Sequence, residues 1–266
     1  MKLRFLGTGT SCGVPVIGCQ CEVCTSTDPH DHRLRCSALV ETSSTRLLID
    51  CGPDFRQQML PLKFRKIDAI LVTHHHYDHV GGMDDLRPFC IFGDINIYAD
   101  STAAANIRHN MPYCFVEHKY PGVPNIRLIE VSAHESFTVG DLSITPFIVM
   151  HGRLPILAYR IESLTSHSVL VYITDMKTIS PSEVPYARGA DVMVINALRF
   201  TKAHHSHLLV DESLAFIREV SPTQALLVHS CHDIGLHSAV NARLPHPVRL
   251  AYDGEEIEVS PSCQTI

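Results

Sequence analysis

Residues 70–82 read ILVTHHHYDHVGG, an apolar run that leads into four histidines and an aspartate. Residues 69–73 are apolar and mostly β-branched, which predicts a short buried strand. If the chain stays extended past Thr73, side chains alternate, so His74 and His76 project to one side while His75 points away. Imidazole groups placed in this way at the end of a buried strand predict a metal site.

The second half of the same stretch adds another pair of metal-type ligands. Asp78 and His79 stand at the start of a helix that residues 80–86 predict, and there they face a second ion. A histidine-rich surface loop that binds metal weakly is the alternative interpretation. The alternating spacing at the end of a buried strand favours one ligand pair for each of two ions.

This His-x-His-x-Asp-His string resembles that of the metallo-β-lactamase superfamily of binuclear hydrolases. The resemblance implies an α+β fold, the αββα four-layer sandwich, in which two mixed sheets lie face to face with helices outside. We expect one such domain over residues 1–266, with a structural zinc loop at residues 19–24. The alternation of predicted strands and helices along the chain is compatible with that fold.

Composition indicates a globular protein of the cytoplasm. Of the 266 residues, 45% are hydrophobic and 19% charged, and no run approaches the ~18 apolar residues of a membrane helix. The start, MKLRFLGTGT, breaks into glycine and threonine too early for a signal peptide. The formal net charge is −6, and the basic runs are short, such as residues 33–35 and 63–66, which we interpret as solvated faces. We therefore expect neither a membrane nor a nucleic acid as partner.

Three of the ten cysteines cluster as Cys19, Cys21 and Cys24. Three thiolates at this spacing can occupy three corners of a zinc tetrahedron at ~2.3 Å each, with one corner left for a distant ligand. Incidental thiols or a redox dithiol are the alternatives. His232, three residues beyond His229, is spaced to turn away from the ion that His229 would bind, so it can supply the fourth corner.

Further candidates follow other predicted strands. The resemblance places Asp50 beneath the metals, where it orients a ligand histidine, and His151 as the third nitrogen on the first ion. Asp175 ends the strand predicted at 169–174 and can bridge two cations ~3.5–4 Å apart, although an N-cap is its alternative role. His229 would complete the second ion. The predicted metal set is His74, His76, Asp78, His79, His151, Asp175 and His229.

Residues 204–207 read HHSH and precede a helix predicted at 210–220. The phosphodiesterases and tRNA-processing enzymes that the sequence resembles carry a histidine before such a helix, which contacts phosphate or protonates the leaving group. His207 matches it by its offset from the helix, and His205 is the alternative.

The resemblance extends to the cyclic phosphodiesterases that act on phosphoribosyl 1,2-cyclic phosphate, which share the cysteine loop and a His-x-x-His near the carboxyl end. It implies a metal-dependent phosphoric diester hydrolase acting on a small cyclic phosphate or phosphodiester. The expected mechanism uses two divalent ions, Zn, Mn or Fe, that share a hydroxide, one structural Zn, and the catalytic residues Asp78, Asp175 and His207.

Three alternatives stay open at this point: a tRNA 3′-processing nuclease, a thioester hydrolase, and a metal-binding accessory protein without catalysis. Substrate specificity is assigned to the loops at residues 111–124 and 153–157. A homodimer is compatible with the sequence.

Overall fold

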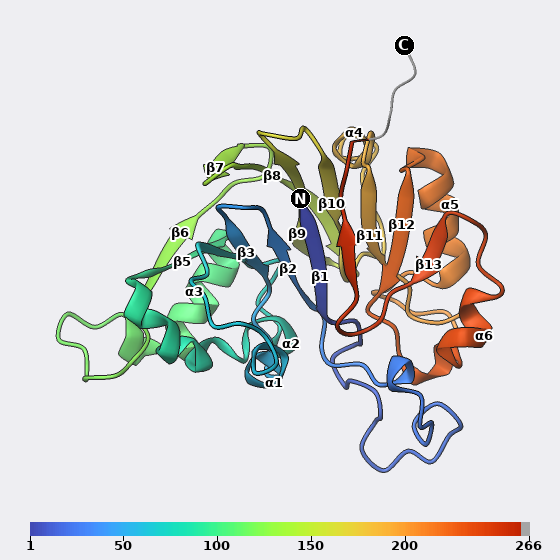
Figure 1. Cartoon of the computed structure of the whole chain (residues 1–266), viewed down its shortest axis with the longest axis horizontal. Coiled ribbons are helices and arrows are strands. Elements are labelled where there is room, and N and C mark those ends of the chain that lie inside the picture. Colours follow the sequence, from blue (N-terminus) through green and yellow to red (C-terminus); the bar gives the residue numbers. More distant parts are fainter. Residues whose placement is uncertain (262–266) are drawn as a thin grey trace.

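Two seven-stranded mixed sheets pack face to face in the computed structural model, which describes residues 1–261 (Figure 1). The strand order is β14-β1-β2-β3-β4-β5-β6 in the first sheet and β13-β12-β11-β10-β9-β8-β7 in the second. The last five residues of the predicted domain, 262–266, lie outside the described residues. The first sheet contains β1 (Lys2–Gly7), β2 (Ser37–Glu41), β3 (Arg46–Ile49), β4 (Ala69–Leu71), β5 (Ile95–Ala99), β6 (Ile126–Glu130) and β14 (Glu256–Glu258).

The second sheet is formed by the carboxyl-terminal half of the chain. It contains β7 (Phe137–Val139), β8 (Leu142–His151), β9 (Leu154–Ser163), β10 (Val169–Tyr172), β11 (Val192–Asn196), β12 (Gln224–Val228) and β13 (Val248–Leu250). The α-helices are α1 (Phe55–Met59), α2 (Tyr77–Val80), α3 (Ser101–Asn110), α4 (Val184–Ala187), α5 (Val210–Val220) and α6 (His237–Asn241). Short 3-10 helices are η1 (Pro29–Asp31), η2 (Met83–Phe92), η3 (Pro112–Cys114) and η4 (His232–Ile234).

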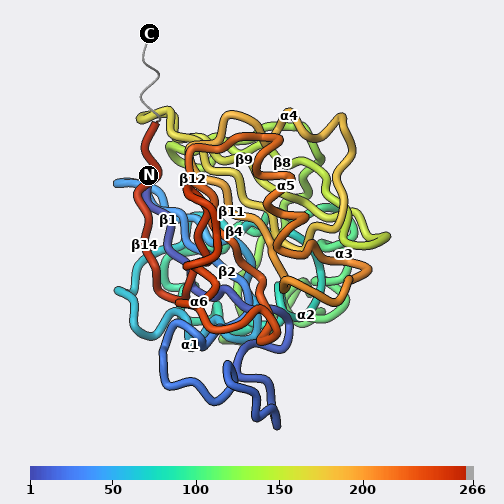
Figure 2. Tube along the Cα trace, turned by 90° about the vertical axis from the view of Figure 1, so that its right-hand side faces the viewer, coloured from blue at the N-terminus to red at the C-terminus, as the bar shows by residue number. Residues whose placement is uncertain are grey.

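Both faces of each sheet are buried, and the strand sequences show why. In β3, Leu47 and Ile49 face the opposite sheet, while Leu48 between them packs under the helices of the first half. In β11, Val192 and Val194 lie between the sheets, and Met193 packs beneath the outer helices of the second half. Apolar residues at every position are what a strand covered on both faces requires. The predicted α+β four-layer sandwich is therefore confirmed (Figures 1 and 2).

Parallel pairing gathers the functional segments at one edge of the sandwich. Strands β3 to β6 run parallel in the first sheet, as do β10 to β13 in the second. The segments that follow β3, β4, β10 and β12 carry Asp50, the histidine string, Asp175 and His229. Ligands can converge here because carboxyl ends of parallel strands share an edge.

Several local expectations were wrong. The helix expected at 80–86 begins earlier, at Tyr77, and ends at Val80, because Gly81 and Gly82 separate it from the 3-10 helix η2. Strands β7, β9 and β13 were not predicted, and residues 154–157 of the loop expected at 153–157 form the start of β9. His151 is the last residue of β8 instead of lying past the strand.

Arg33 corrects another expectation, since we took residues 33–35 for a solvated face. Its side chain is buried and donates hydrogen bonds to the Thr8 hydroxyl and the Ala251 carbonyl, both at 2.7 Å. Burial lowers the pKa of this guanidinium, and the nearby carboxylates Asp253 and Asp31 oppose the shift. Arg33 therefore joins the amino-terminal loop to the carboxyl-terminal segment.

Within residues 1–261 we find no helix with the length and hydropathy needed to cross a membrane.

Tyr159 supplies a test of how the second sheet supports the histidine string. This fully buried tyrosine on β9 donates a hydrogen bond of 2.6 Å to the carbonyl of Val72. Tyr159→Phe leaves that carbonyl buried without its donor, so we expect the free energy of unfolding to fall by about 1–3 kcal/mol. Urea denaturation measures the change, and Tyr120→Phe at an exposed tyrosine is the control. Equal stability of the two variants would contradict the assignment.

Candidate metal and catalytic site

The first cluster consists of His74, His76 and His151, whose ring nitrogens lie within 4.8 Å of one another. His74 and His76 do project to the same side, with 3.0 Å between Nε2 of His74 and Nδ1 of His76. His151 donates from Nδ1 to the carbonyl of Ser206 at 2.9 Å, which leaves its Nε2 available to the cluster. Three nitrogen ligands from two sheets therefore converge on one point.

The second cluster consists of Asp78, His79 and His229, again within 4.8 Å of one another. An oxygen of Asp78 lies 3.3 Å from Nε2 of His79 and 3.8 Å from Nε2 of His229. All three side chains are largely buried.

Asp175 lies between the two clusters. Its Oδ2 is 3.2 Å from Nε2 of His79, and its Oδ1 is 3.0 Å from Nε2 of His229. It also lies within 4.8 Å of ring nitrogens of His74 and His151. The carboxylate therefore has residues of both clusters within reach.

Asp50 lies behind the clusters as a fully buried carboxylate with three donors. The backbone N–H and the hydroxyl of Thr73 donate to it at 2.8 Å each, and Nδ1 of His79 donates at 2.7 Å. This last bond fixes the His79 tautomer and turns Nε2 toward Asp78 and Asp175. Asp50 thus contacts the histidine string through Thr73 and His79.

Gly52 and Gly82 allow the backbone that follows Asp50 to pack directly against the segment of α2. A Cβ on Gly52 would overlap the carbonyl oxygen of Asp78, and one on Gly82 would overlap the carbonyl of Gly52. The backbones are joined by hydrogen bonds from Cys51 N–H to His79 and from Gly82 N–H to Cys51, of 2.8 and 2.9 Å. Close backbone approach is the reason for glycine here.

Three of the site residues have left-handed backbone conformations. The φ angles of Asp50, Asp175 and His229 are 58°, 56° and 54°. This region is sparsely populated by residues other than glycine, although Asp and His enter it more readily than most, and such strain concentrates at functional sites. The three residues lie within three positions of the ends of β3, β10 and β12, so each turn redirects the chain where a strand ends.

The electrostatics indicate an environment suited to cations. Burial lowers the pKa of His229, but the Asp175 carboxylate outweighs it and raises that pKa to about 9. Burial likewise opposes ionisation of Asp78, while His79 and His229 hold the pKa of its carboxyl well below the usual range.

Several buried polar atoms at the site lack hydrogen-bond partners. Nε2 of His79 and both ring nitrogens of His229 are buried without one, even though carboxylates lie at ion-pair distance. Buried polar atoms are rarely left in this state, and a divalent cation would satisfy both the nitrogens and the carboxylate oxygens. The donor set therefore fits metal ions.

The structure distinguishes His207 from His205 by their surroundings. Nδ1 of His207 lies 3.5 Å from Asp175, and its ring is 4.8 Å from that of His229. His205 instead stacks on His204, at 4.6 Å, on the side away from the cluster formed by His151, Asp175 and His207. His204 stacks on His207 at 4.8 Å, a contact that the sequence pattern did not reveal. Burial lowers the pKa of the His207 imidazole well below its usual range.

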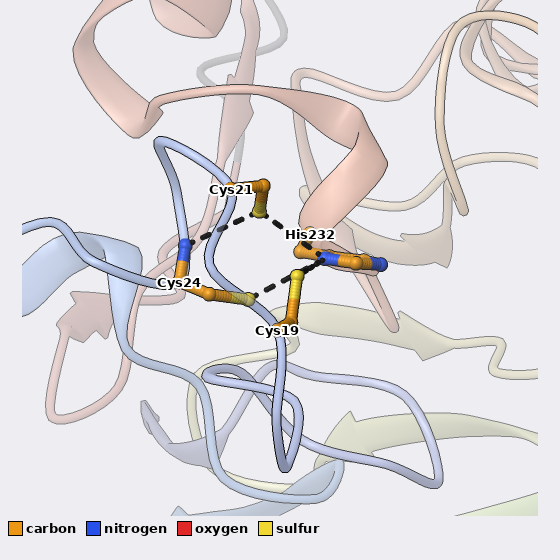
Figure 3. Close-up of side chains that lie close together, drawn as sticks. All are labelled: Cys19, Cys21, Cys24 and His232. Carbon is orange, nitrogen blue, oxygen red and sulfur yellow. Dashed lines mark hydrogen bonds between the residues drawn. The ribbon is translucent and has the colours of Figure 1, made fainter.

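A separate cluster joins Cys19, Cys21 and Cys24 to His232 (Figure 3). The three sulfurs lie 3.2, 3.3 and 3.4 Å from Nδ1 of His232. Ligands at zinc–sulfur and zinc–nitrogen bond lengths in a tetrahedron would be separated by about 3.6 Å, so the four groups need only small shifts to hold an ion. The Cys24 backbone N–H points to the Cys21 sulfur and lowers the pKa of that thiol to about 6.

Comparison with known proteins identifies relatives over most of the chain. Residues 45–230 match the family model described as "Beta-lactamase superfamily domain". The chain is 35% identical to a solved diphosphatase of the PhnP family, with a TM-score of 0.87 over 96% of both chains. It is 41% identical to an octanoyltransferase of Porphyromonas gingivalis, over 96% of this chain and 51% of that protein. A ribonuclease Z of Methanopyrus kandleri is 28% identical over 61% of this chain and 50% of its own length.

The chain therefore spans about half the length of these two curated relatives.

Asp50→Asn tests whether the buried carboxylate tunes the site. The amide keeps the shape of the side chain but loses one acceptor oxygen, which frees the His79 ring. We expect affinity for divalent metal to fall by about 10–100-fold. Competition with a chelating dye measures the affinity, and Asp94→Asn on an exposed loop is the control. Unchanged affinity would show that His79 needs no such partner.

Proposed function

The chain belongs to the β-lactamase superfamily, a fold family that is hydrolytic and implies divalent metal ions, and on that premise we propose that it is a phosphodiesterase. Its substrate is a small phosphodiester or cyclic phosphate. The observation that carries the proposal is the position of Asp175, with its oxygens within reach of both ligand clusters. Similarity to a diphosphatase over 96% of the chain supports phosphorus as the centre attacked.

In this proposal His74, His76 and His151 would hold one divalent ion. Asp78, His79 and His229 would hold a second, and Asp175 would be within reach of both. Two divalent ions bound there supply Lewis acidity and lower the pKa of water from 15.7 toward ~7. The mixed nitrogen and oxygen ligands suit Zn, Mn or Fe, and metal supply in the cell decides among them.

The chain's own residues position the reaction. Asp50 holds His79, and the Ser206 carbonyl holds His151, so both rings keep their orientation without reorganisation. His207 is the group placed to hydrogen-bond the phosphate and pass a proton to the leaving oxygen. Burial lowers the pKa of this imidazole, whereas an approaching phosphate anion favours its charged form, in which the ring carries the proton that it gives to the leaving oxygen.

The cysteine cluster has a structural role in this proposal. A zinc ion bound by Cys19, Cys21, Cys24 and His232 fastens the amino-terminal loop to η4, which follows the strand that carries His229. Metal binding of this kind stabilises the folded chain because the site exists only when both segments are in place.

A second candidate is thioester hydrolysis. The observation that favours it is the 41% identity to the P. gingivalis octanoyltransferase, whose name describes acyl transfer. The match covers 51% of that protein, so its name does not assign the transfer reaction to the matched half. A tRNA nuclease has less support, because a formal net charge of −6 disfavours the binding of a polyanion.

Activity toward bis(p-nitrophenyl) phosphate with added Mn²⁺ tests the proposal. We expect the wild type to release p-nitrophenol, and His74→Ala and Asp175→Asn to lose more than about 100-fold in kcat/KM, since removing a ligand should cost at least as much as removing its supporting residue. His109→Ala, at an exposed position on α3, is the matched control. Turnover of octanoyl-thioesters but of no phosphodiester would overturn the proposal in favour of the second candidate.

Cys24→Ser tests the structural zinc separately. We expect bound zinc to fall by one ion per chain and the thermal midpoint to drop, because a structural ion contributes directly to folding. Metal analysis and thermal denaturation give both quantities. Cys12→Ser changes an exposed cysteine outside the cluster and serves as control. Equal zinc content in both variants would refute the assignment.

A further inference from the structure

A cavity of about 480 Å³ is lined by residues of α2, η2, α3 and η3. Its wall includes His75 and Tyr77, the residues immediately before and after the metal-type ligand His76. Because consecutive Cα atoms are ~3.8 Å apart, the backbone of this wall lies next to that of a residue in the candidate metal site. Its volume is in the ~300–1,000 Å³ range of small-molecule sites.

The floor of this cavity is apolar and its rim is polar. Val80, Met83, Ile107 and Met111 are buried and form the floor. The rim carries the rings of Tyr77 and Tyr113, which are 70% and 38% exposed, and the side chain of Asn110. Exposed aromatic rings beside buried methionines are suited to stacking against a flat ligand.

Asp84 fixes one wall of the cavity. It accepts a hydrogen bond from the Tyr113 hydroxyl at 2.9 Å and pairs with Arg87 at 2.7 Å. Arg87 in turn donates to the carbonyl of Gly122 at 2.7 Å. These bonds join η3 and the loop that follows it to η2.

The same wall offers hydrogen-bond acceptors. The Tyr113 hydroxyl donates its proton to Asp84, so its oxygen can accept from a ligand. Oδ2 of Asp84 receives one bond, from Nε of Arg87 at 3.0 Å, and has a further lone pair. A ligand that presents N–H donors at the edge of a flat ring would satisfy both.

The lining side chains are poorly suited to two other classes of ligand, phosphate groups and alkyl chains. None of the described lining residues is lysine or arginine, so the cavity is not a second phosphate site. An alkyl chain would fit the floor but would leave Asp84, Asn110 and the Tyr113 hydroxyl without polar partners. A heteroaromatic base matches both the floor and the rim.

We propose that this cavity binds the nucleobase of a nucleoside phosphate whose phosphorus is attacked at the neighbouring metal clusters. The proposal rests on the phosphodiesterase function and narrows its substrates to those that carry a base. The amino group of adenine or cytosine donates to the Tyr113 and Asp84 oxygens, and the ring stacks against Tyr77.

Two measurements test the proposal. The first is the ratio of kcat/KM for adenosine 2′,3′-cyclic phosphate to that for methyl riboside 2′,3′-cyclic phosphate, which lacks the base. We expect the wild type to prefer the base-bearing substrate, and we expect Tyr77→Ala and Asn110→Ala to lower the ratio. The decrease should be about tenfold for Tyr77→Ala, because stacking of a base on an aromatic ring contributes a factor of about ten or more. Tyr120→Ala, at a 79% exposed tyrosine outside the cavity, should leave the ratio unchanged.

The second measurement is calorimetric binding of adenosine itself, which requires no turnover. Binding to the wild type that weakens about tenfold in Tyr77→Ala but not in Tyr120→Ala supports the cavity, even if no phosphodiester is hydrolysed and the proposed function fails. A wild-type ratio near one, or adenosine binding that is equal in the wild type and Tyr77→Ala, overturns the nucleobase assignment while leaving phosphodiester hydrolysis intact.

Discussion

The site depends on a single buried carboxylate, Asp50. It accepts hydrogen bonds from the backbone and side chain of Thr73 and from the ring of His79, so it ties the end of β3 to the end of β4 and to α2. Burial raises the pKa of Asp50, and the bonds from His79 and Thr73 oppose that shift. An ionised carboxylate here is tolerated only because all three donors are present. Without it the histidine string would lose the anchor that orients its most buried ring.

Both halves of the chain contribute residues to the two clusters. The first sheet supplies the histidine string and Asp78, whereas the second supplies His151, Asp175 and His229. Asp50, Asp175 and His229 all adopt left-handed backbone conformations where their strands end. Local strain of about 1–3 kcal/mol at such a residue persists only when the surrounding structure imposes it. Packing of the two sheets and the geometry of the site are therefore parts of the same constraint.

Much of this arrangement could be predicted from the sequence, because alternation and strand-end position are local properties. Because side chains alternate along an extended chain, His74 and His76 face the same way. Asp50, Asp175 and His229 lie at or just after the ends of apolar runs. The sequence did not distinguish His205 from His207, since that choice depends on how the segment before α5 packs against Asp175. The burial of Arg33 was missed because its partners, Thr8 and Ala251, are remote in sequence. The cavity beside α2 is formed by two separate stretches of the chain, residues 75–84 and 107–113, and no sequence motif predicts it.

The proposed mechanism requires that the residues around Asp175 hold a pair of cations close enough to act on one phosphate. Anomalous X-ray diffraction from crystals grown with Mn²⁺ or Zn²⁺ would locate these ions. We expect two anomalous peaks ~3.5–4 Å apart, one beside His74, His76 and His151 and one beside Asp78, His79 and His229, with Asp175 between them. A single peak that Asp175 does not contact, or no peak at these residues, would contradict it.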